Sequence, residues 1–267
     1  MKYKLQITNY IIFILFLIVN LFINSIVLAT PLTDSEPLAK PPQLSTKWEN
    51  IGLDINLGGT YLSGNVNFIN LNSKLLFNAN YLEHSIFVDT GNMFNYSDDK
   101  IILNKINASL LYAYSFHENL NFYFSSTHAY NQFSKLDYRL SNGVGICVHK
   151  FLEPAFSMFL VSAGVNLEHE WFQQNIKNQA WAIALRSTFD LPVTEYVNLG
   201  SDFIYTPRLH DFGDFRIYEE AYLKFKITDN LLSFKLSLTD EYNSRPQPEV
   251  KNNDFGILGS LIFHFGN

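Results

Sequence analysis

The sequence predicts an all-β fold, namely an antiparallel up-and-down transmembrane β-barrel of about 12 strands. Three observations predict it: regular apolar/polar alternation, segments longer than ordinary strands, and high aromatic content at low hydropathy. In residues 101–117, Ala108, Leu110 and Tyr112 fall on one parity, and Asn107 and Ser109 fall on the other. Because strand side chains alternate between two faces, this segment has one apolar face and one polar face. Ordinary strands have ~5–6 residues, whereas a tilted strand crossing a bilayer needs about 9–11.

Composition agrees with such a barrel. Aromatic residues make up 16% of the 267 residues, and the mean hydropathy is close to zero. This balance excludes several transmembrane helices and is typical of an apolar exterior around a polar interior. The net charge of −6, without any Lys/Arg cluster, excludes nucleic acid as a partner. The single cysteine, Cys147, cannot form an intramolecular disulfide, and we interpret it as a small lumen-facing filler.

Residues 1–29 are typical of a secretory signal peptide. Lys2 and Lys4 precede an apolar stretch over residues 11–28, and small residues predict cleavage after Ala29. An uncleaved membrane anchor is the alternative. A protein with a secretory signal peptide and a transmembrane β-barrel is expected in an outer membrane.

Residues 30–47 contain four prolines and predict a Pro-rich periplasmic lead-in, with a lumen plug as the alternative. The barrel is expected over residues 48–267. Its first six strands alternate in parity and are separated by turn signals. They are residues 51–61, 69–81, 85–96, 101–117, 120–125 and 138–149. Their apolar faces contain, in order, Leu53 and Leu57, Leu71 and Leu75, Val88, Leu110 and Tyr112, Phe122 and Phe124, and Val144 and Ile146. Their polar faces contain, in order, Asp54 and Asn56, Asn70 and Lys74, Asp89, Lys105 and Asn107, Asn121 and Ser125, and Arg139 and Ser141.

Six further segments repeat the same alternation. They are residues 159–171, 181–189, 197–205, 216–227, 232–241 and 254–265. Their apolar faces contain, in order, Val161 and Val165, Ile183 and Leu185, Leu199 and Phe203, Leu223 and Phe225, Phe234 and Leu236, and Ile257 and Leu261. Their polar faces contain, in order, Asn166 and Glu168, Ala184 and Arg186, Asn198 and Asp202, Glu220 and Lys224, Ser233 and Lys235, and Ser260 and His264.

Alternation alone does not say which face lies inside, because a soluble barrel would bury its apolar face. Twelve long strands, however, would leave a soluble barrel with an apolar lumen too wide to fill. Aromatic side chains also lie at or near the strand ends on the apolar face, as interfacial girdles do. They are Tyr61, Tyr81, Tyr96, Tyr114, Phe116, Tyr130, Trp171, Trp181 and Tyr205.

The connections between strands are predicted to alternate in length. With both termini in the periplasm, the odd-numbered connections are extracellular and are expected to be longer. Short turns are predicted near Glu83, Glu118, Val193 and Asp229. Longer connections are predicted around Lys135, Asn175, residues 210–212 and residues 245–252. The short turn at Ser63 and the middling one at residues 152–155 fit this alternation less well.

The polar face of these strands predicts a charged lumen. Twelve strands ~4.8 Å apart and tilted by ~40° give a backbone cylinder on the order of 24 Å across. Mixed charges in so narrow a space favour a salt-bridged plug over a selective pore. The predicted lumen network is Lys74, Lys105, Arg139, Glu168, Glu170, Arg186, Asp202, Arg216, Glu220, Lys224 and Lys235.

Catalytic chemistry has one candidate. Ser126 and His128 share the apolar parity of one strand near its outer end, where a phospholipase of this architecture would hold a serine and a histidine. We interpret them instead as polar rim residues, and we predict no enzyme activity, no cofactor and no metal. Other histidines and acids fit lumen fillers or solvated loop charges better than metal ligands. They are His149, His264, His210, Asp211 and Asp214.

Several short motifs together resemble the salt-induced outer-membrane protein family, also described as domain of unknown function 481. The resemblance covers residue 51 to the C-terminus. The motifs are Gly52-Leu53, Ser63-Gly64-Asn65, Arg139-Leu140-Ser141-Asn142-Gly143-Val144-Gly145, Glu168 to Trp171, Asp214-Phe215-Arg216, Tyr242-Asn243-Ser244-Arg245-Pro246 and Asp254. The resemblance implies an outer-membrane barrel and brings no catalytic residues.

The last predicted strand alternates toward an aromatic residue near its end, with Leu261, Phe263 and Phe265 on one parity. By the same resemblance, such a strand implies recognition by the barrel-assembly machinery. We therefore predict a monomeric outer-membrane barrel in contact with outer-membrane lipids, with a largely plugged lumen and a structural or envelope-stress role. A narrow channel is a variant of this prediction. An outer-membrane hydrolase using Ser126 and His128, and a soluble periplasmic binding barrel, are the alternatives.

Overall fold

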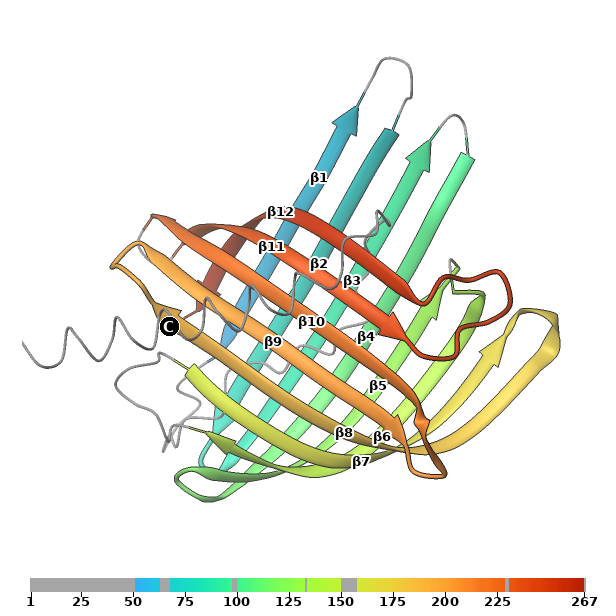
Figure 1. The fold of residues 1–267 in the computed structure, drawn as a ribbon. Coiled ribbons are helices and arrows are strands. Elements are labelled where there is room, and N and C mark those ends of the chain that lie inside the picture. Colours follow the sequence, from blue (N-terminus) through green and yellow to red (C-terminus); the bar gives the residue numbers. More distant parts are fainter. Residues whose placement is uncertain are drawn as a thin grey trace, which may run out of the picture. The chain divides into compact units, whose positions relative to one another are not determined.

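The computed structural model describes residues 51–62, 68–97, 100–132, 134–149, 158–228 and 231–266. These residues form twelve strands and one short 3-10 helix, all within one compact unit of the chain (Figure 1). The elements are β1 (Gly52–Leu62), β2 (Phe68–Tyr81), β3 (His84–Ser97), β4 (Lys100–His117), β5 (Leu120–Asn131), β6 (Leu136–His149), β7 (Met158–Phe172), η1 (Gln173–Asn175), β8 (Ile176–Pro192), β9 (Val197–Arg208), β10 (Asp211–Thr228), β11 (Leu232–Asn243) and β12 (Asn253–Gly266).

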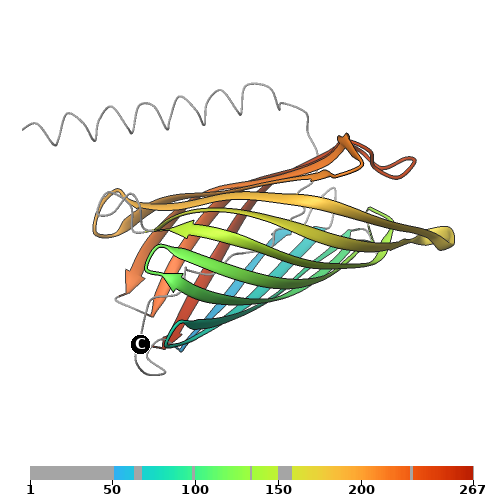
Figure 2. The same cartoon turned by 90° about the horizontal axis from the view of Figure 1, so that it is seen from below.

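The strands close into one antiparallel barrel. Each strand pairs with its neighbours in the sequence, and β1 completes the ring by pairing with β12, for example Leu53 with Phe265 and Leu57 with Leu261. Figure 2 shows the strands running obliquely around the barrel. Closure leaves no unpaired sheet edge, and every strand finds backbone partners on both sides. The predicted twelve-stranded up-and-down barrel is confirmed.

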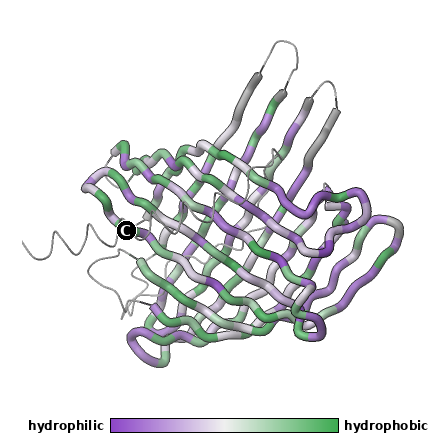
Figure 3. The backbone as a smooth tube through the Cα atoms, in the orientation of Figure 1, coloured by the Kyte–Doolittle hydropathy of each residue, from purple (hydrophilic) through white to green (hydrophobic). Residues whose placement is uncertain are grey.

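Apolar side chains lie on the outside of the barrel and charged side chains lie inside, which is the reverse of a soluble protein. Leu110 and Phe234 lie on the exterior with 43% and 36% of their surface exposed. Lys105 and Glu170 face the interior and are each only 2% exposed. Lysine and glutamate are rarely buried so completely unless they are paired. Figure 3 shows hydropathy alternating along the strands, as one apolar and one polar face require.

Large side chains occupy part of the lumen. Tyr123 lies across β6 and β7, where a Cβ added to Gly145 would approach its hydroxyl oxygen to 2.5 Å. Tyr123 also packs with Cys147, Ala113 and Leu160 in a small apolar cluster, so Cys147 is buried inside the barrel. Small residues on these strands therefore make room for the large aromatic rings that fill the interior.

The prediction of connection lengths is wrong at two sites. The connection at Asn175, predicted to be longer, has three residues, 173–175, fewer than the four residues, 193–196, of the turn predicted to be short near Val193. Residues 210–212 were predicted within a long connection, but β9 ends at Arg208 and β10 begins at Asp211. The ladder continues through this polar stretch with a register irregularity between Asp211 and Phe215. Backbone pairing does not depend on apolar side chains, so a polar sequence extends the hairpin instead of opening into a loop. The predicted turns at residues 63–65 and 152–155 lie outside the described residues.

Candidate functional site: the polar lumen

Strand register sets lumen-facing side chains in lateral rows. Arg139 on β6 pairs directly with Glu170 on β7, which pairs with Asn178 on β8. One row further in, Thr127 on β5 pairs with Ser141, which pairs with Glu168. Because lumen-facing positions recur every second residue, successive rows stack along the barrel axis.

Three arginines meet one carboxylate in the half of the lumen next to the connection between β11 and β12, which we call the outer half, the other half being the inner half. Glu170 accepts from Arg139 Nε at 2.9 Å, from Arg208 Nη2 at 2.6 Å and from Arg216 Nη1 at 3.1 Å. We call Glu170 and these three residues the arginine cluster. Two further carboxylates balance the excess positive charge: Glu168 accepts from Arg216, and Asp214 lies 3.0 Å from Arg208. Buried charges are tolerated when every one of them is paired and hydrogen-bonded in this way.

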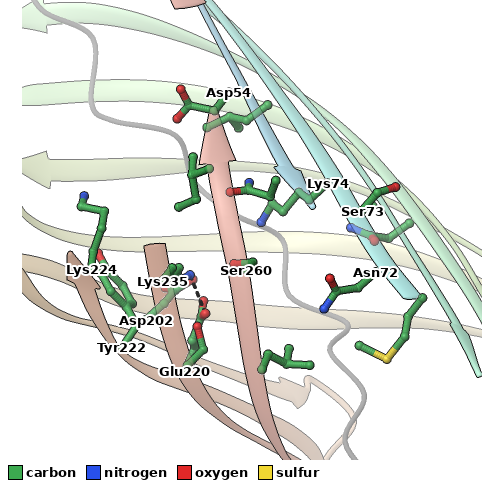
Figure 4. Close-up of a pocket in the computed structure, with 18 of the residues that line it drawn as sticks. Asp54, Asn72, Ser73, Lys74, Asp202, Glu220, Tyr222, Lys224, Lys235 and Ser260 are labelled. Atoms are coloured by element: carbon green, nitrogen blue, oxygen red, sulfur yellow. Dashed lines mark ion pairs between the residues drawn. The ribbon is translucent and has the colours of Figure 1, made fainter. Parts of the chain in front are cut away.

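The inner half contains a larger cavity of about 290 Å³ with a different arrangement (Figure 4). Asp190 accepts from Lys224 Nζ at 3.0 Å, from the Tyr222 hydroxyl at 3.1 Å and from Asn198 Nδ2 at 2.5 Å. The other charges lie in single pairs on adjacent strands. They are Lys74–Asp89 at 3.3 Å, Arg186–Asp202 at 2.5 Å and Lys235–Glu220 at 2.5 Å. In addition, His264 Nδ1 lies 2.8 Å from Asp54 Oδ1.

One ion pair crosses the lumen. Lys105 Nζ on β4 lies 3.2 Å from Glu241 Oε2 on β11. In the ring order, β3, β2, β1 and β12 separate these two strands, so the pair spans nearly the full width of the barrel. Lys105 lines the inner cavity, while Glu241 lines two smaller cavities of about 80 and 100 Å³. The cross-lumen pair therefore lies where the inner and outer cavities meet.

A connection also reaches across the mouth of the barrel at its outer end. Residues 244–252, which join β11 to β12 and which we call the strap, line the 100 Å³ cavity together with Glu170. At one end, Arg245 lies 2.7 Å from Asp211. At the other end, Lys135 Nζ donates to Glu249 and to the Pro248 carbonyl, both at 2.8 Å. Lys135 precedes β6, on the opposite side of the ring from β11 and β12, so the strap reaches across the mouth.

Hydrogen bonding to Lys135 lowers the pKa of Glu249 below its ordinary value of 4.5. The Glu249 side chain is largely exposed, so solvent screens this contact. The strap is therefore held by surface ion pairs, unlike the buried arginine cluster beneath it.

The family model for a protein of unknown function, DUF481, matches residues 55–265. The chain belongs to this family. No curated protein matches the chain. Among solved structures, the NanC porin has 10% identity and a TM-score of 0.44, with coverage of 80% of this chain and 99% of that one. The translocator domain of the autotransporter NalP from Neisseria meningitidis has 11% identity and a TM-score of 0.42, with coverage of 81% and 87%. The KdgM porin has 10% identity and a TM-score of 0.42, with coverage of 80% and 99%.

All members of the predicted lumen network lie around the cavities of this DUF481 barrel. Those around the inner cavity are Lys74, Lys105, Arg186, Asp202, Glu220, Lys224 and Lys235. Those around the two outer cavities are Arg139, Glu168, Glu170 and Arg216. The structure does not bring them all together, because Arg186 and Asp202 pair beside the inner cavity, whereas the arginine cluster lines the cavity of about 100 Å³.

Sequence reasoning missed Asp190 and Arg208, which are central to the two halves of the lumen. The predicted strands ended at residues 189 and 205, whereas β8 continues to Pro192 and β9 to Arg208. Asp190 shares the parity of Arg186, and Arg208 shares the parity of Asp202. Extending the same alternation by a few residues would have placed both in the lumen.

The hydrolase candidates Ser126 and His128 have different neighbours in this DUF481 barrel. His128 Nδ1 lies 2.6 Å from the hydroxyl of Tyr138, whose ring is 5.3 Å from that of Trp171. Ser126 faces Asn142 across the ladder. Within the part of the chain that the structure describes, no group of three or more His, Cys, Asp or Glu residues is arranged to hold a metal ion. Nor does any helix there have the length and apolar character needed to cross a membrane.

Proposed function

We propose that this protein is a monomeric outer-membrane barrel whose polar lumen is closed to solutes and whose role is structural within the envelope, including under stress. The exterior supports the membrane location. Leu110, Phe124, Leu185 and Phe234 are all exposed, while the charged side chains are inside. A surface with apolar side chains on nearly every strand is stable only against hydrocarbon.

Export and assembly form part of the proposal. The N-terminal segment, with cleavage near Ala29, and the lead-in over residues 30–47 lie outside the described residues. Leu261 and Phe265 on β12 are exposed on the outer face, next to the β1 seam that closes the ring. A terminal strand with exposed apolar side chains is available to the assembly machinery before closure.

The Lys105–Glu241 pair is the observation that carries the closed lumen. It joins nearly opposite walls at 3.2 Å, and the strap covers the mouth above it. A solute that displaced this pair would leave the buried Lys105 ammonium without the Glu241 carboxylate, and removing one buried partner typically costs about 3–5 kcal/mol.

Planar-bilayer recording tests this proposal. The purified full chain is expected to insert without producing regular single-channel steps, whereas Glu241→Gln is expected to produce them. A semi-native gel shift before and after boiling checks that both proteins are folded. Regular steps from the unaltered protein would overturn the closed lumen, and extraction into buffer without detergent would overturn the membrane location.

A narrow gated channel is the second candidate. It is favoured by the three cavities, which adjoin one another along the lumen, and by the exposed ion pairs that hold the strap. Under this candidate, Glu249→Gln combined with Arg245→Gln releases the strap and raises the open probability. Under the closed-lumen proposal, the same double variant produces no single-channel currents, because the Lys105–Glu241 pair remains in place.

A further inference from the structure

The middle of the lumen contains buried polar atoms that no group among the described residues satisfies. Thr127 Oγ1, Asn166 Oδ1 and Glu168 Oε2 are all buried, and none has a hydrogen-bond partner among the described residues. All three side chains line the same cavity of about 80 Å³. Buried acceptors without a partner are unfavourable, and native proteins satisfy them almost completely. These three oxygens therefore require a small donor inside the cavity.

Water fits this cavity in size. A cavity needs about 10–15 Å³ of accessible volume for each water molecule, so a space of about 80 Å³ holds several. The polar lining supplies the two to four partners that an ordered water needs. Thr127 and Glu168 lie in one lateral row with Ser141 between them, and the Ser141 hydroxyl adds a further polar group.

The charge around the cavity favours a neutral occupant. Its charged lining residues are Arg139, Arg216, Glu168 and Glu241, whose formal charges cancel. A cation at this place would lie beside two guanidinium groups, and an anion would lie beside two carboxylates. Water avoids both repulsions, because it donates to the free acceptors and can accept from the guanidinium groups.

The cavity also adjoins its neighbours on both sides. It shares Asn107 and Tyr218 with the inner cavity of about 290 Å³. It shares Arg139, Arg216 and Glu241 with the cavity of about 100 Å³ beneath the strap. Polar spaces thus follow one another from the inner half of the lumen to the outer mouth.

From this arrangement we propose that water crosses the barrel along these three cavities while ions and larger solutes do not. Arg139 and Arg216 of the arginine cluster and Glu241 of the cross-lumen pair line both cavities at the outer junction. Water passes this junction by exchanging hydrogen bonds, whereas an ion must shed its hydration shell between charges that are already paired. The inference relies on the proposed function in two respects, namely a barrel that spans a membrane and a lumen closed to solutes, and ionic recording separates the second from the water path.

Stopped-flow light scattering tests the water path. Vesicles containing the purified full chain are expected to shrink faster under an osmotic gradient than protein-free vesicles of the same lipid. Ala129→Leu places a bulky side chain into the middle cavity, since Ala129 is buried and lines it. This variant is expected to return the shrinkage rate to that of protein-free vesicles.

Ala163→Leu is the matched control, because Ala163 lies on the exposed outer face of β7. It is expected to shrink as fast as the unaltered protein, and a boiling-dependent gel shift confirms folding of all three proteins. A rate equal to that of protein-free vesicles for the unaltered barrel, or an unchanged rate in Ala129→Leu, would overturn the water path. Regular ionic steps in a bilayer together with fast shrinkage would overturn the solute-tight lumen and leave the water path standing.

Discussion

The two halves of the lumen neutralise buried charge in different ways. In the outer half, Glu170 accepts from three guanidinium groups carried by β6, β9 and β10. In the inner half, Asp190 accepts from one ammonium group, Lys224, and from the neutral groups of Tyr222 and Asn198. One carboxylate thus links four strands through charge, while the other depends mainly on neutral donors.

This difference teaches why arginine and lysine occupy different parts of the barrel. A planar guanidinium can contact two carboxylates at once, as Arg216 does with Glu168 and Glu170. An ammonium group is a compact charge that suits a single partner beside a larger cavity, as with Lys235 and Glu220. In the outer half, the loss of one charge is therefore expected to weaken the contacts of the whole arginine cluster. In the inner half, the loss of one charge is expected to affect only its own pair.

The largest expected effect follows from removing the charge of Glu170. Glu170→Gln leaves three buried guanidinium groups short of a carboxylate and is expected to lower the free energy of unfolding by about 3–5 kcal/mol. Urea titration of the reconstituted barrel, followed by tryptophan fluorescence, measures it. Asp190→Asn is the matched inner variant, and its expected loss is about 1.5–3 kcal/mol, the value of a hydrogen bond to a charged group. Equal losses in the two variants would contradict the contrast between the halves.

A smaller effect on the free energy of unfolding is expected when arginine is replaced by lysine in the outer half, or lysine by arginine in the inner half. Arg216→Lys cannot maintain contacts with both Glu168 and Glu170, and a loss of about 1.5–3 kcal/mol is expected in the same titration. Lys224→Arg has the inner cavity of about 290 Å³ beside it and is expected to change stability by less than about 0.5 kcal/mol. A larger loss of unfolding free energy in Lys224→Arg than in Arg216→Lys would contradict this contrast. It would mean that the space around Lys224, rather than the number of carboxylates it contacts, limits the inner half.

The smallest effect concerns the strap, whose ion pairs are exposed. The pKa of Glu249 is lowered by its hydrogen bond to Lys135, so this contact favours the closed strap at any pH above the ordinary carboxyl value. Its contribution is lost as the pH falls through the lowered pKa, that is, below the ordinary value of 4.5. Hydrogen exchange of residues 244–252 is expected to accelerate only in that acidic window. In Glu249→Gln the exchange near Lys135 is expected to be faster at neutral pH and to lack this acid step, while exchange in the barrel strands stays unchanged.

Much of the fold was predictable because alternation is a local property. Long apolar/polar segments such as residues 101–117 predicted the strands, and their polar faces predicted which charges enter the lumen. The strand ends were not predictable from apolar periodicity. Polar residues at the start of β10 extend the strand: Asp211 pairs with Arg208, and Asp214 lies in the register irregularity that follows, where it contacts the Arg208 side chain.

By itself, the sequence determined that the chain forms long two-faced strands and that charged residues share one face, because parity depends only on neighbouring residues. Only the tertiary structure decided which charges meet. Lys105 and Glu241 are separated by 136 positions in the chain, and Lys135 meets the strap from the opposite side of the ring. Such contacts depend on the closure of β1 onto β12 and on the register of every strand between them. No local pattern encodes their combined geometry.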